Sequence, residues 1–513
     1  MRSMYLAGLC LLVMQQLKSQ MPSAYQPPVF TDTARLRKIR ATEPIVRSLY
    51  ETYAQANHFP GLTYAVISEG QVMYSGATGV TDLASKTAAS TRSVFRIASM
   101  SKSFTAMAIL KLRDAGRLKL DDAAAAYIPE MKSLGYLTKD ARPITIRDLL
   151  THSAGFPEDN PWGDRQLQDS DKELLQLIRK GTSFSNVPGV QYEYSNLGFA
   201  LLGQIVSRVS GTTYQQYIAD SIWKPLGMTH TYWEYTKVPA GELAHGYRWS
   251  NDQWQEEALL HDGAYGAMGG ILTTMEDFTR YMALHLSAWP PRNEPENTVL
   301  QRSSLREMHQ PWRFNNLNPN YRYPGSSKAC PLVSAYGYGL RWSNDCQNRT
   351  TVGHSGGLPG FGSHWIILPE YGIGIVCFAN RTYAPTTPVN MQVMDTVIAL
   401  AGLHPRDLPA SAILEQRRQE LVKLLPSWKG AEQSGIFAEN FFPDYTLPAL
   451  QKEAALLFAK VGKILRVGPL VAENQLRGSF ILEGEKGRLQ VFFTLTPENP
   501  ALIQEYRIRE VKE

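Results

Sequence analysis

The sequence lacks the motifs that tie a chain to a metal ion or a nucleotide. It contains no HExxH, no cysteine pairs at metal-ligand spacing, no Walker loop, and no strand followed by GxGxxG with an acidic residue downstream. Each of these chemistries needs its residue types at a fixed spacing. We therefore expect neither a metal ion nor another cofactor.

Strong charge of one sign is also absent. The 513 residues include 52 Lys plus Arg and 47 Asp plus Glu, and the small positive excess forms no long basic runs. A protein that follows a phosphate backbone needs such runs, so nucleic acid is not an expected partner. With 43% hydrophobic residues, the chain can bury a large core in two or three domains.

Cysteine is scarce, with 4 residues in the whole chain. Cys330 and Cys346 lie in a loop-rich region and can close a disulfide bond in an oxidising compartment. Cys377 lies in the apolar run 373–378, which favours a buried free thiol.

Long apolar runs are missing after the N-terminus. Arg2 precedes the apolar run 4–14, which is too short to cross a bilayer but suits the core of a signal peptide. The polar, Pro-containing stretch 15–28 favours a signal over an ordinary buried helix. A lipid anchor at Cys10 is disfavoured because the residue before it is large. We predict a signal peptide over residues 1–24, a periplasmic or secreted protein, and no membrane span in the mature chain.

Apolar periodicity predicts an α+β fold, with an antiparallel sheet flanked by helices and an inserted helical lobe. An early and a late hairpin can complete the sheet, with strands at 62–67, 72–75, 362–368 and 372–380. Helices are expected at 43–55 and 99–112, and through the mostly helical stretch 120–290. The proline-rich stretch 289–330 is expected to be irregular.

A domain boundary is expected near residues 405–409, which separates a large domain at 25–404 from a small one at 410–513. The small domain is predicted to be α+β, with helices at 413–425 and 450–461 and strands at 478–483, 489–495 and 501–509. It contains no cluster of titratable residues. Its role is left open beyond packing or substrate gating.

An SxxK pattern from Ser99 to Lys102 opens a strongly apolar helix. Residues three apart share a helix face, so the Lys102 amine can reach the Ser99 hydroxyl. Burial lowers the pKa of a lysine, which can then accept the serine proton. The pattern alone is weak, because about one or two copies are expected by chance in a chain this long. A second copy, Ser221 to Lys224, ends against a proline and is not expected to be catalytic.

Tyr194-Ser195-Asn196 forms a YxN triplet where a loop enters a predicted helix. The Tyr194 phenol can relay a proton between the serine and a leaving group if a nearby cation lowers its pKa. The amide of Asn196 can hold Lys102 and a substrate carbonyl. Taken alone, the triplet is more simply interpreted as a helix N-cap.

An HxG pattern from His354 to Gly356, followed by Gly357, precedes the late hairpin. Glycine lets a substrate approach a strand edge, and the backbone amides of Gly357 and Ser99 can form an oxyanion hole. A rival HxG at His261 does not precede a pair of strands, which favours His354. Single histidines are more often structural.

Taken in order, these SxxK, YxN and HxG patterns resemble the serine β-lactamase and penicillin-binding-protein superfamily. Residues 95–112, 149–155, 269–274 and 353–362 resemble its class C β-lactamase-related branch, and the similarity covers roughly residues 35–400. That branch includes D-alanyl-D-alanine carboxypeptidases, D-amino-acid peptidases and carboxylesterases.

The resemblance implies a role for each matched residue. Ser99 is the acylated nucleophile, Lys102 and Tyr194 handle its proton, Asn196 is a positioning residue, Gly357 is an oxyanion donor, and His354 and Gly356 border the substrate. Many members carry lysine where this chain has His354, and an imidazole binds a substrate carboxylate less firmly than an ammonium group. This difference disfavours strong β-lactamase activity and favours esterase or peptidase activity.

The sequence thus predicts a serine hydrolase that forms an acyl-enzyme with small amides, D-amino-acid peptides or esters. The alternative is a non-catalytic protein that kept the fold and binds cell-wall fragments or β-lactams. Joint retention of the SxxK and YxN residues favours the enzyme. Neither interpretation fixes the substrate or the oligomeric state.

Overall fold

The computed structural model describes residues 25–296 and 299–511, which fall into two compact units. The larger unit is Asp32–Pro405, and the smaller is Arg406–Glu513 with the chain up to Thr31. The predicted signal peptide, including Cys10, lies outside the described residues.

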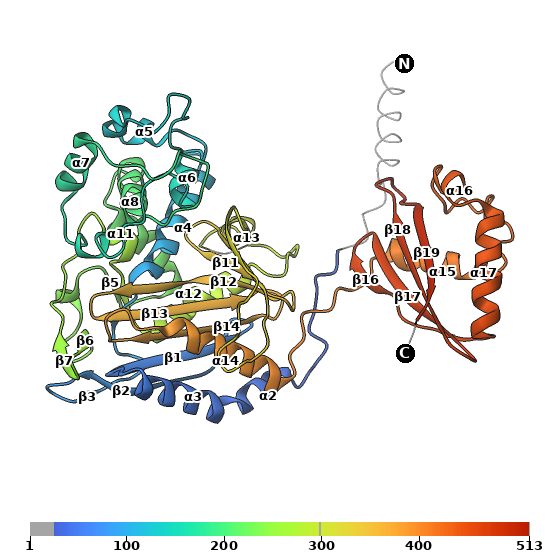
Figure 1. Ribbon diagram of the computed structural model, residues 1–513, viewed down its shortest axis with the longest axis horizontal. Coiled ribbons are helices and arrows are strands. Elements are labelled where there is room, and N and C mark those ends of the chain that lie inside the picture. Colours follow the sequence, from blue (N-terminus) through green and yellow to red (C-terminus); the bar gives the residue numbers. More distant parts are fainter. Residues whose placement is uncertain (1–24, 297–298, 512–513) are drawn as a thin grey trace, which may run out of the picture. The chain divides into compact units, whose positions relative to one another are not determined.

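Among the described residues of the larger unit, a nine-stranded antiparallel sheet forms the centre (Figure 1). Its order is β3-β2-β1-β14-β13-β12-β11-β10-β9. Strand β1 pairs with β14, with Leu62 opposite Ala379, so the early and late hairpins complete one sheet as predicted. The bounds are β1 Gly61–Ser68, β2 Gln71–Asp82, β3 Thr87–Ala88, β9 Arg313–Asn318, β10 Leu332–Tyr336, β11 Arg341–Asn344, β12 Thr350–Leu358, β13 Phe361–Leu368 and β14 Ile373–Ala379.

Helices cover both faces of this sheet, so β1, β13 and β14 are buried along their whole length. The side chains of β1 alternate: Leu62, Tyr64 and Val66 join one core, and Ala65 and Ile67 join the other. The first core is closed by α3 (Glu43–Ala56) and α14 (Thr386–Ala401), the second by α4 (Ser101–Asp114) and α12 (Met275–Ser287). The predicted α+β fold is confirmed.

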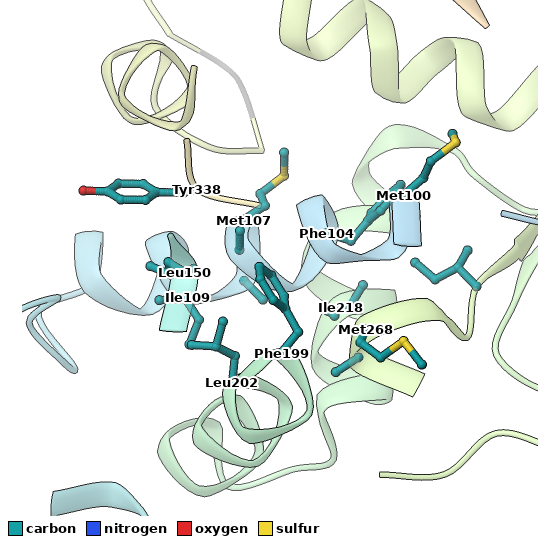
Figure 2. Packing of buried hydrophobic residues seen from close by; sticks show 14 of the residues in the cluster. Met100, Phe104, Met107, Ile109, Leu150, Phe199, Leu202, Ile218, Met268 and Tyr338 are labelled. Carbon is teal, nitrogen blue, oxygen red and sulfur yellow. The ribbon is translucent and has the colours of Figure 1, made fainter. Parts of the chain in front are cut away.

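The helical lobe packs α8 (Asn196–Ser210) against α4 and α6 (Ile146–Leu150). Every residue of α4 up to Leu112 is buried except Lys111, which accounts for the apolar run 106–110. Figure 2 shows Met107 of α4, Phe199 of α8 and Met268 of α11 (Gly266–Gly269) in this core. This packing fixes the helix that follows Ser99.

The stretch 289–330 is more regular than predicted. It contains α13 (Arg302–Met308) and β9, and β10 and β11 follow. The prediction of an irregular stretch is wrong for these two elements. β9 gives no apolar signal because it is an edge strand without a buried face: Phe314 is 62% exposed and Leu317 is 55% exposed.

The cysteines behave as the sequence suggests. Cys330 and Cys346, which flank β10 and β11, form a disulfide bond. Cys377 on β14 is a buried free thiol, and burial raises its pKa.

The smaller unit has its own core. Helices α15 (Ala412–Leu424) and α17 (Leu447–Val461) and strands β17 (Arg477–Gly484), β18 (Arg488–Leu495) and β19 (Ile503–Glu510) overlap the predicted elements. Two unpredicted short strands, β15 (Ile464–Val467) and β16 (Val471–Asn474), extend the sheet, whose strands are all antiparallel. Across residues 25–296 and 299–511, no helix is long and apolar enough to traverse a bilayer.

Candidate active site

Ser99 stands in a strained turn between β4 (Phe95–Arg96) and α4. The preceding residue, Ala98, has a φ of 51°, a left-handed conformation that is uncommon outside glycine. The Ser101 hydroxyl holds this turn, because it donates to the Ala98 carbonyl at 2.7 Å and accepts from the Ile271 amide at 3.1 Å. The backbone of Ala98, directly before Ser99, is thus held in a conformation that costs about 1–3 kcal/mol.

The Lys102 amine meets Ser99 in the interior. Its Nζ lies 3.0 Å from Ser99 Oγ, 2.7 Å from Asn196 Oδ1 and 2.9 Å from the Met268 carbonyl oxygen. Burial lowers the pKa of Lys102 to about 7, although nearby carboxylates act in the opposite direction. The lowered pKa expected from the sequence is confirmed, and a neutral amine is available near neutral pH.

At the start of α8, one residue caps the helix and the next one contacts Lys102. Ser195 is the N-cap, because its Oγ accepts from the Gly198 amide at 3.2 Å. The side chain of Asn196 is left for the site: Oδ1 accepts from Lys102, and Nδ2 donates to Asn160 Oδ1 at 2.7 Å. Both interpretations of the triplet therefore hold, on adjacent residues.

Tyr194 completes the group. The Lys102 Nζ lies 4.8 Å from the centre of its ring, and its hydroxyl is hydrogen-bonded to the Ser99 side chain. The pKa of Tyr194 is not lowered as the relay argument required. Burial raises it, and the positive charge of Arg341 offsets only part of that effect. Tyr194 therefore stays protonated at ordinary pH, so it can donate a proton but is not the resting base.

Glycine brings β12 against the turn that carries Ser99. A Cβ on Gly356 would lie 2.3 Å from both the Ile97 carbonyl oxygen and Ser363 Oγ, which are hydrogen-bonded to each other at 2.7 Å. Only glycine permits so close an approach. The next residue on this strand is Gly357, whose amide is the predicted oxyanion donor.

His354 lies in the site, but its ring is closed off. The side chain is 1% exposed, with Nδ1 2.5 Å from the Ser355 carbonyl oxygen and Nε2 2.8 Å from the Tyr336 hydroxyl. Because a carbonyl can only accept, Nδ1 carries the proton and Nε2 accepts from the phenol. Burial holds the pKa of His354 well below its ordinary value, and the charges of Arg341 and Lys102 act in the same direction. His354 therefore presents no positive charge to a substrate.

Arg341 is the cation that the motifs did not indicate. It is exposed, and its guanidinium carbon lies 5.4 Å from the centre of the Tyr194 ring. It begins β11 and reaches the site because that strand pairs with β12, with Arg341 opposite Gly353. A single arginine in a short strand without apolar periodicity gives no sequence signal.

Asp164 is a second residue without a sequence signal. Its carboxylate is 2% exposed, and Oδ2 accepts from the Tyr383 hydroxyl at 3.0 Å. Burial raises the pKa of Asp164 to about 6, while Lys102 acts to lower it. Tyr383 contacts Gly357, where a Cβ would approach its ring to 2.9 Å. Asp164 thus connects the helical lobe to the strand that carries the oxyanion donor.

We expect kcat/KM to rise with pH through about 7, the pKa of Lys102. Below that pH the protonated amine cannot accept a proton from Ser99, so the acid limb should fall with a slope of about one. Tyr194 should add no basic limb below about pH 10, because burial raises its pKa. Rates with an uncharged nitrophenyl ester check this, and a flat profile across neutral pH would contradict it.

The rival patterns lie apart from these residues. Ser221 donates to a carbonyl of its own helix, and the Lys224 side chain is 71% exposed and paired with a neighbouring carboxylate. The exposed His261 bonds a surface glutamate. Residues 353–357 also match GxSxG and do lie in the site, but they run along β12 and not through a strand-to-helix turn, so they form no nucleophile elbow. In the part of the chain that the structure describes, no His, Cys, Asp or Glu cluster could hold a metal ion.

Comparisons with known proteins match most of the larger unit. The profile of the beta-lactamase family matches residues 46–398. Protein flp of Staphylococcus aureus (strain COL) is 30% identical over 384 residues, which cover 73% of this chain and 70% of that protein. Penicillin-binding protein 4* of Bacillus subtilis (strain 168) is 25% identical over 355 residues, which cover 66% of this chain and 71% of that protein.

Two solved structures share the fold. The octameric penicillin-binding protein homologue from Pyrococcus abyssi aligns with a TM-score of 0.57 and 20% identity, over 91% of this chain and 99% of that one. The penicillin binding protein from Bacillus halodurans aligns with a TM-score of 0.54 and 23% identity, over 68% of this chain and 98% of that one. At these identities the likeness concerns the fold alone.

Proposed function

Because this chain belongs to the beta-lactamase family, we propose that it is a serine hydrolase that forms an acyl-enzyme through Ser99. The observation that carries the proposal is the buried Lys102 amine, 3.0 Å from the Ser99 hydroxyl. Its partners are a hydroxyl, an amide oxygen and a carbonyl, not a carboxylate. Burying a lysine in this way destabilises a fold, which favours a functional role for it.

Acylation follows from the positions of the three side chains. Neutral Lys102 accepts the proton of Ser99 as Oγ attacks the substrate carbonyl carbon. Negative charge moves to the carbonyl oxygen, to which the amides of Ser99 and Gly357 donate. When the tetrahedral intermediate collapses, the Tyr194 hydroxyl gives its proton to the leaving group and takes the proton held by Lys102.

Deacylation runs through the same groups. A water molecule attacks the ester on Ser99, and its proton passes to the neutral Lys102 amine. The bond to Oγ then breaks, Ser99 regains a proton through Tyr194, and the acid product leaves. Lys102 is neutral again at the end of the cycle.

We further propose that the substrate carries an anionic group near the carbonyl that is attacked. The positive charge of Arg341 supports this, since its guanidinium carbon lies 5.4 Å from the centre of the Tyr194 ring, whereas His354 is neutral. Small amides, D-amino-acid peptides and esters all fit, and those with a carboxylate are favoured over uncharged ones.

Arg341→Gln is expected to raise KM for a D-alanyl peptide with a free carboxylate by about 10- to 100-fold, since a charge-assisted hydrogen bond contributes about 1.5–3 kcal/mol. The same peptide with a C-terminal amide should be affected about twofold or less. Arg341→Lys, which keeps the charge, is the matched control. Equal losses with both peptides would contradict a role for Arg341 in recognition.

Covalent labelling tests the acyl-enzyme proposal. A fluorophosphonate probe is expected to add to the peptide that contains Ser99, as located by mass spectrometry, and a penicillin should compete. Absence of this adduct would sink the proposal. A non-catalytic binding protein would instead bind penicillin without hydrolysing a nitrophenyl ester, a chromogenic cephalosporin or a D-alanyl peptide.

We also propose that the protein is exported. The disulfide bond between Cys330 and Cys346 supports this, because such bonds persist in oxidising compartments. Thiol alkylation of fractionated cells checks it: both cysteines should resist alkylation before reduction, in the extracytoplasmic fraction. Free thiols in a cytoplasmic pool would contradict export.

A further inference from the structure

His152 lies beside the site in a conformation that costs energy. It follows α6, is 2% exposed, and has a φ of 54°, the left-handed region that a residue with a side chain avoids. Its carbonyl accepts from the Glu193 amide at 2.8 Å, and its Nδ1 accepts from the Ser195 amide at 3.0 Å. Both bonds hold the segment that contains Tyr194.

The bond to Ser195 fixes the tautomer of the imidazole. A backbone amide can only donate, so Nδ1 of His152 carries a lone pair and Nε2 carries the proton. Among the described residues, no hydrogen-bond partner faces this buried Nε2. Burial holds the pKa of His152 well below its ordinary value, and the charge of Lys102 adds to this effect. The ring is therefore neutral and is not an acid or a base of the reaction.

Aromatic rings enclose the imidazole. Its centroid lies 4.3 Å from that of Tyr194, 4.5 Å from Tyr336, 5.1 Å from Phe199 and 5.9 Å from Tyr192. Such contacts are attractive and directional. The imidazole is held by contact with Tyr336, and its contact with the Tyr194 ring limits rotation of that phenol.

We propose that His152 is a positioning residue for Tyr194: by holding the Ser195 amide and packing on the phenol ring, it directs the Tyr194 hydroxyl toward Ser99 and Lys102. The inference rests on the proposed function, in which Tyr194 passes a proton to the leaving group. The strained φ agrees with it, because backbone strain persists where the surrounding structure requires one geometry.

A misdirected phenol has a specific kinetic signature. A poor leaving group needs the proton that Tyr194 supplies, whereas a good one departs as an anion without it. Loss of His152 should therefore slow a phenyl ester more than the 4-nitrophenyl ester of the same acid. A purely structural defect would slow both esters equally by reducing the folded fraction.

Two substitutions separate the hydrogen bond from the ring. His152→Phe keeps a ring but removes the acceptor for Ser195, and it should lower the ratio of kcat/KM for phenyl over nitrophenyl ester about tenfold. His152→Asn keeps an acceptor and tolerates a positive φ, so it should restore most of the ratio. Titration with a fluorophosphonate normalises each variant to its active fraction.

His285→Phe is the matched control. His285, on α12, is also fully buried with an unpartnered Nε2 among the described residues, but it contacts His309 at the end of α13 and Trp365 on β13. Its replacement should lower the thermal midpoint and leave the leaving-group ratio unchanged. In a Tyr194→Phe background, His152→Phe should have no further effect on the ratio, because both changes remove the same proton transfer.

The outcomes are distinguishable. An unchanged ratio in His152→Phe, or additive effects of the two phenylalanine substitutions, would overturn the role of His152 alone. If the proposed function fails, the unmodified protein will neither take up the fluorophosphonate on Ser99 nor hydrolyse either ester. That result overturns both proposals.

Discussion

Ser99→Ala is expected to lower kcat/KM by about 10⁵- to 10⁶-fold and to abolish fluorophosphonate labelling. The nearby hydroxyls of Ser101 and Ser103 cannot substitute, because they donate to the carbonyls of Ala98 and Met100. Both of those bonds remain in the Ser99→Ala variant and keep the turn in place. Loss of the Ser99 hydroxyl should therefore lower the free energy of unfolding by only about 1 kcal/mol. Steady-state kinetics with the best ester and a thermal melt measure the two effects.

Ser221→Ala is the control for this experiment. It removes the serine of the second SxxK pattern, whose hydroxyl donates to the Tyr217 carbonyl at 2.6 Å. Its activity and labelling should match those of the unmodified protein. Retained labelling in Ser99→Ala, or lost labelling in Ser221→Ala, would contradict the assignment of the nucleophile.

Lys102→Arg is expected to lower kcat by about 10²- to 10⁴-fold, the range for loss of a positioned proton acceptor. Arginine keeps the positive charge but does not give up its proton, so it cannot accept one from Ser99. In this variant, the rise in activity through about pH 7 should disappear, because the amine that titrates there has been removed. Kinetics across pH test this result.

A second variant at Lys102 and a control at Lys224 show whether the loss of activity comes from the lost proton acceptor or from altered packing. Lys102→Met removes both charge and basicity but keeps an unbranched, flexible side chain, and it should be equally inactive. Lys224→Arg, at an exposed lysine of the second SxxK pattern, should have unmodified kinetics. If Lys102→Arg kept more than about a tenth of the activity, Lys102 would not be the base.

The elements that could be predicted from the sequence are those with a clear pattern of apolar residues. Strand β1 alternates between two buried cores, and α4 contains the apolar run 106–110, so both positions follow from residue type. The SxxK pattern needs only the rise of a helix to bring Lys102 to Ser99, which explains why that contact could be predicted.

The parts that could not be predicted depend on long-range pairing and burial. β9 has no buried face, and Arg341 reaches Tyr194 only through the register of β11 against β12. The raised pKa of Tyr194 reflects how many atoms surround its hydroxyl, which no spacing reveals. His152 lies in the family-like segment 149–155, but its role could not be predicted because a sequence match does not reveal a left-handed backbone conformation.

The pairing of β1 with β14 also governs when the larger unit can fold. Leu62 pairs with Ala379, which is synthesised much later, so the centre of the sheet cannot form until nearly the whole unit has left the ribosome. A hairpin of β1 and β2 that forms before then leaves the apolar edge of β1 open, and such an edge is prone to pair with other nascent chains. Synthesis of this protein should therefore depend on chaperones that shield that edge, and its refolding yield should fall as concentration rises.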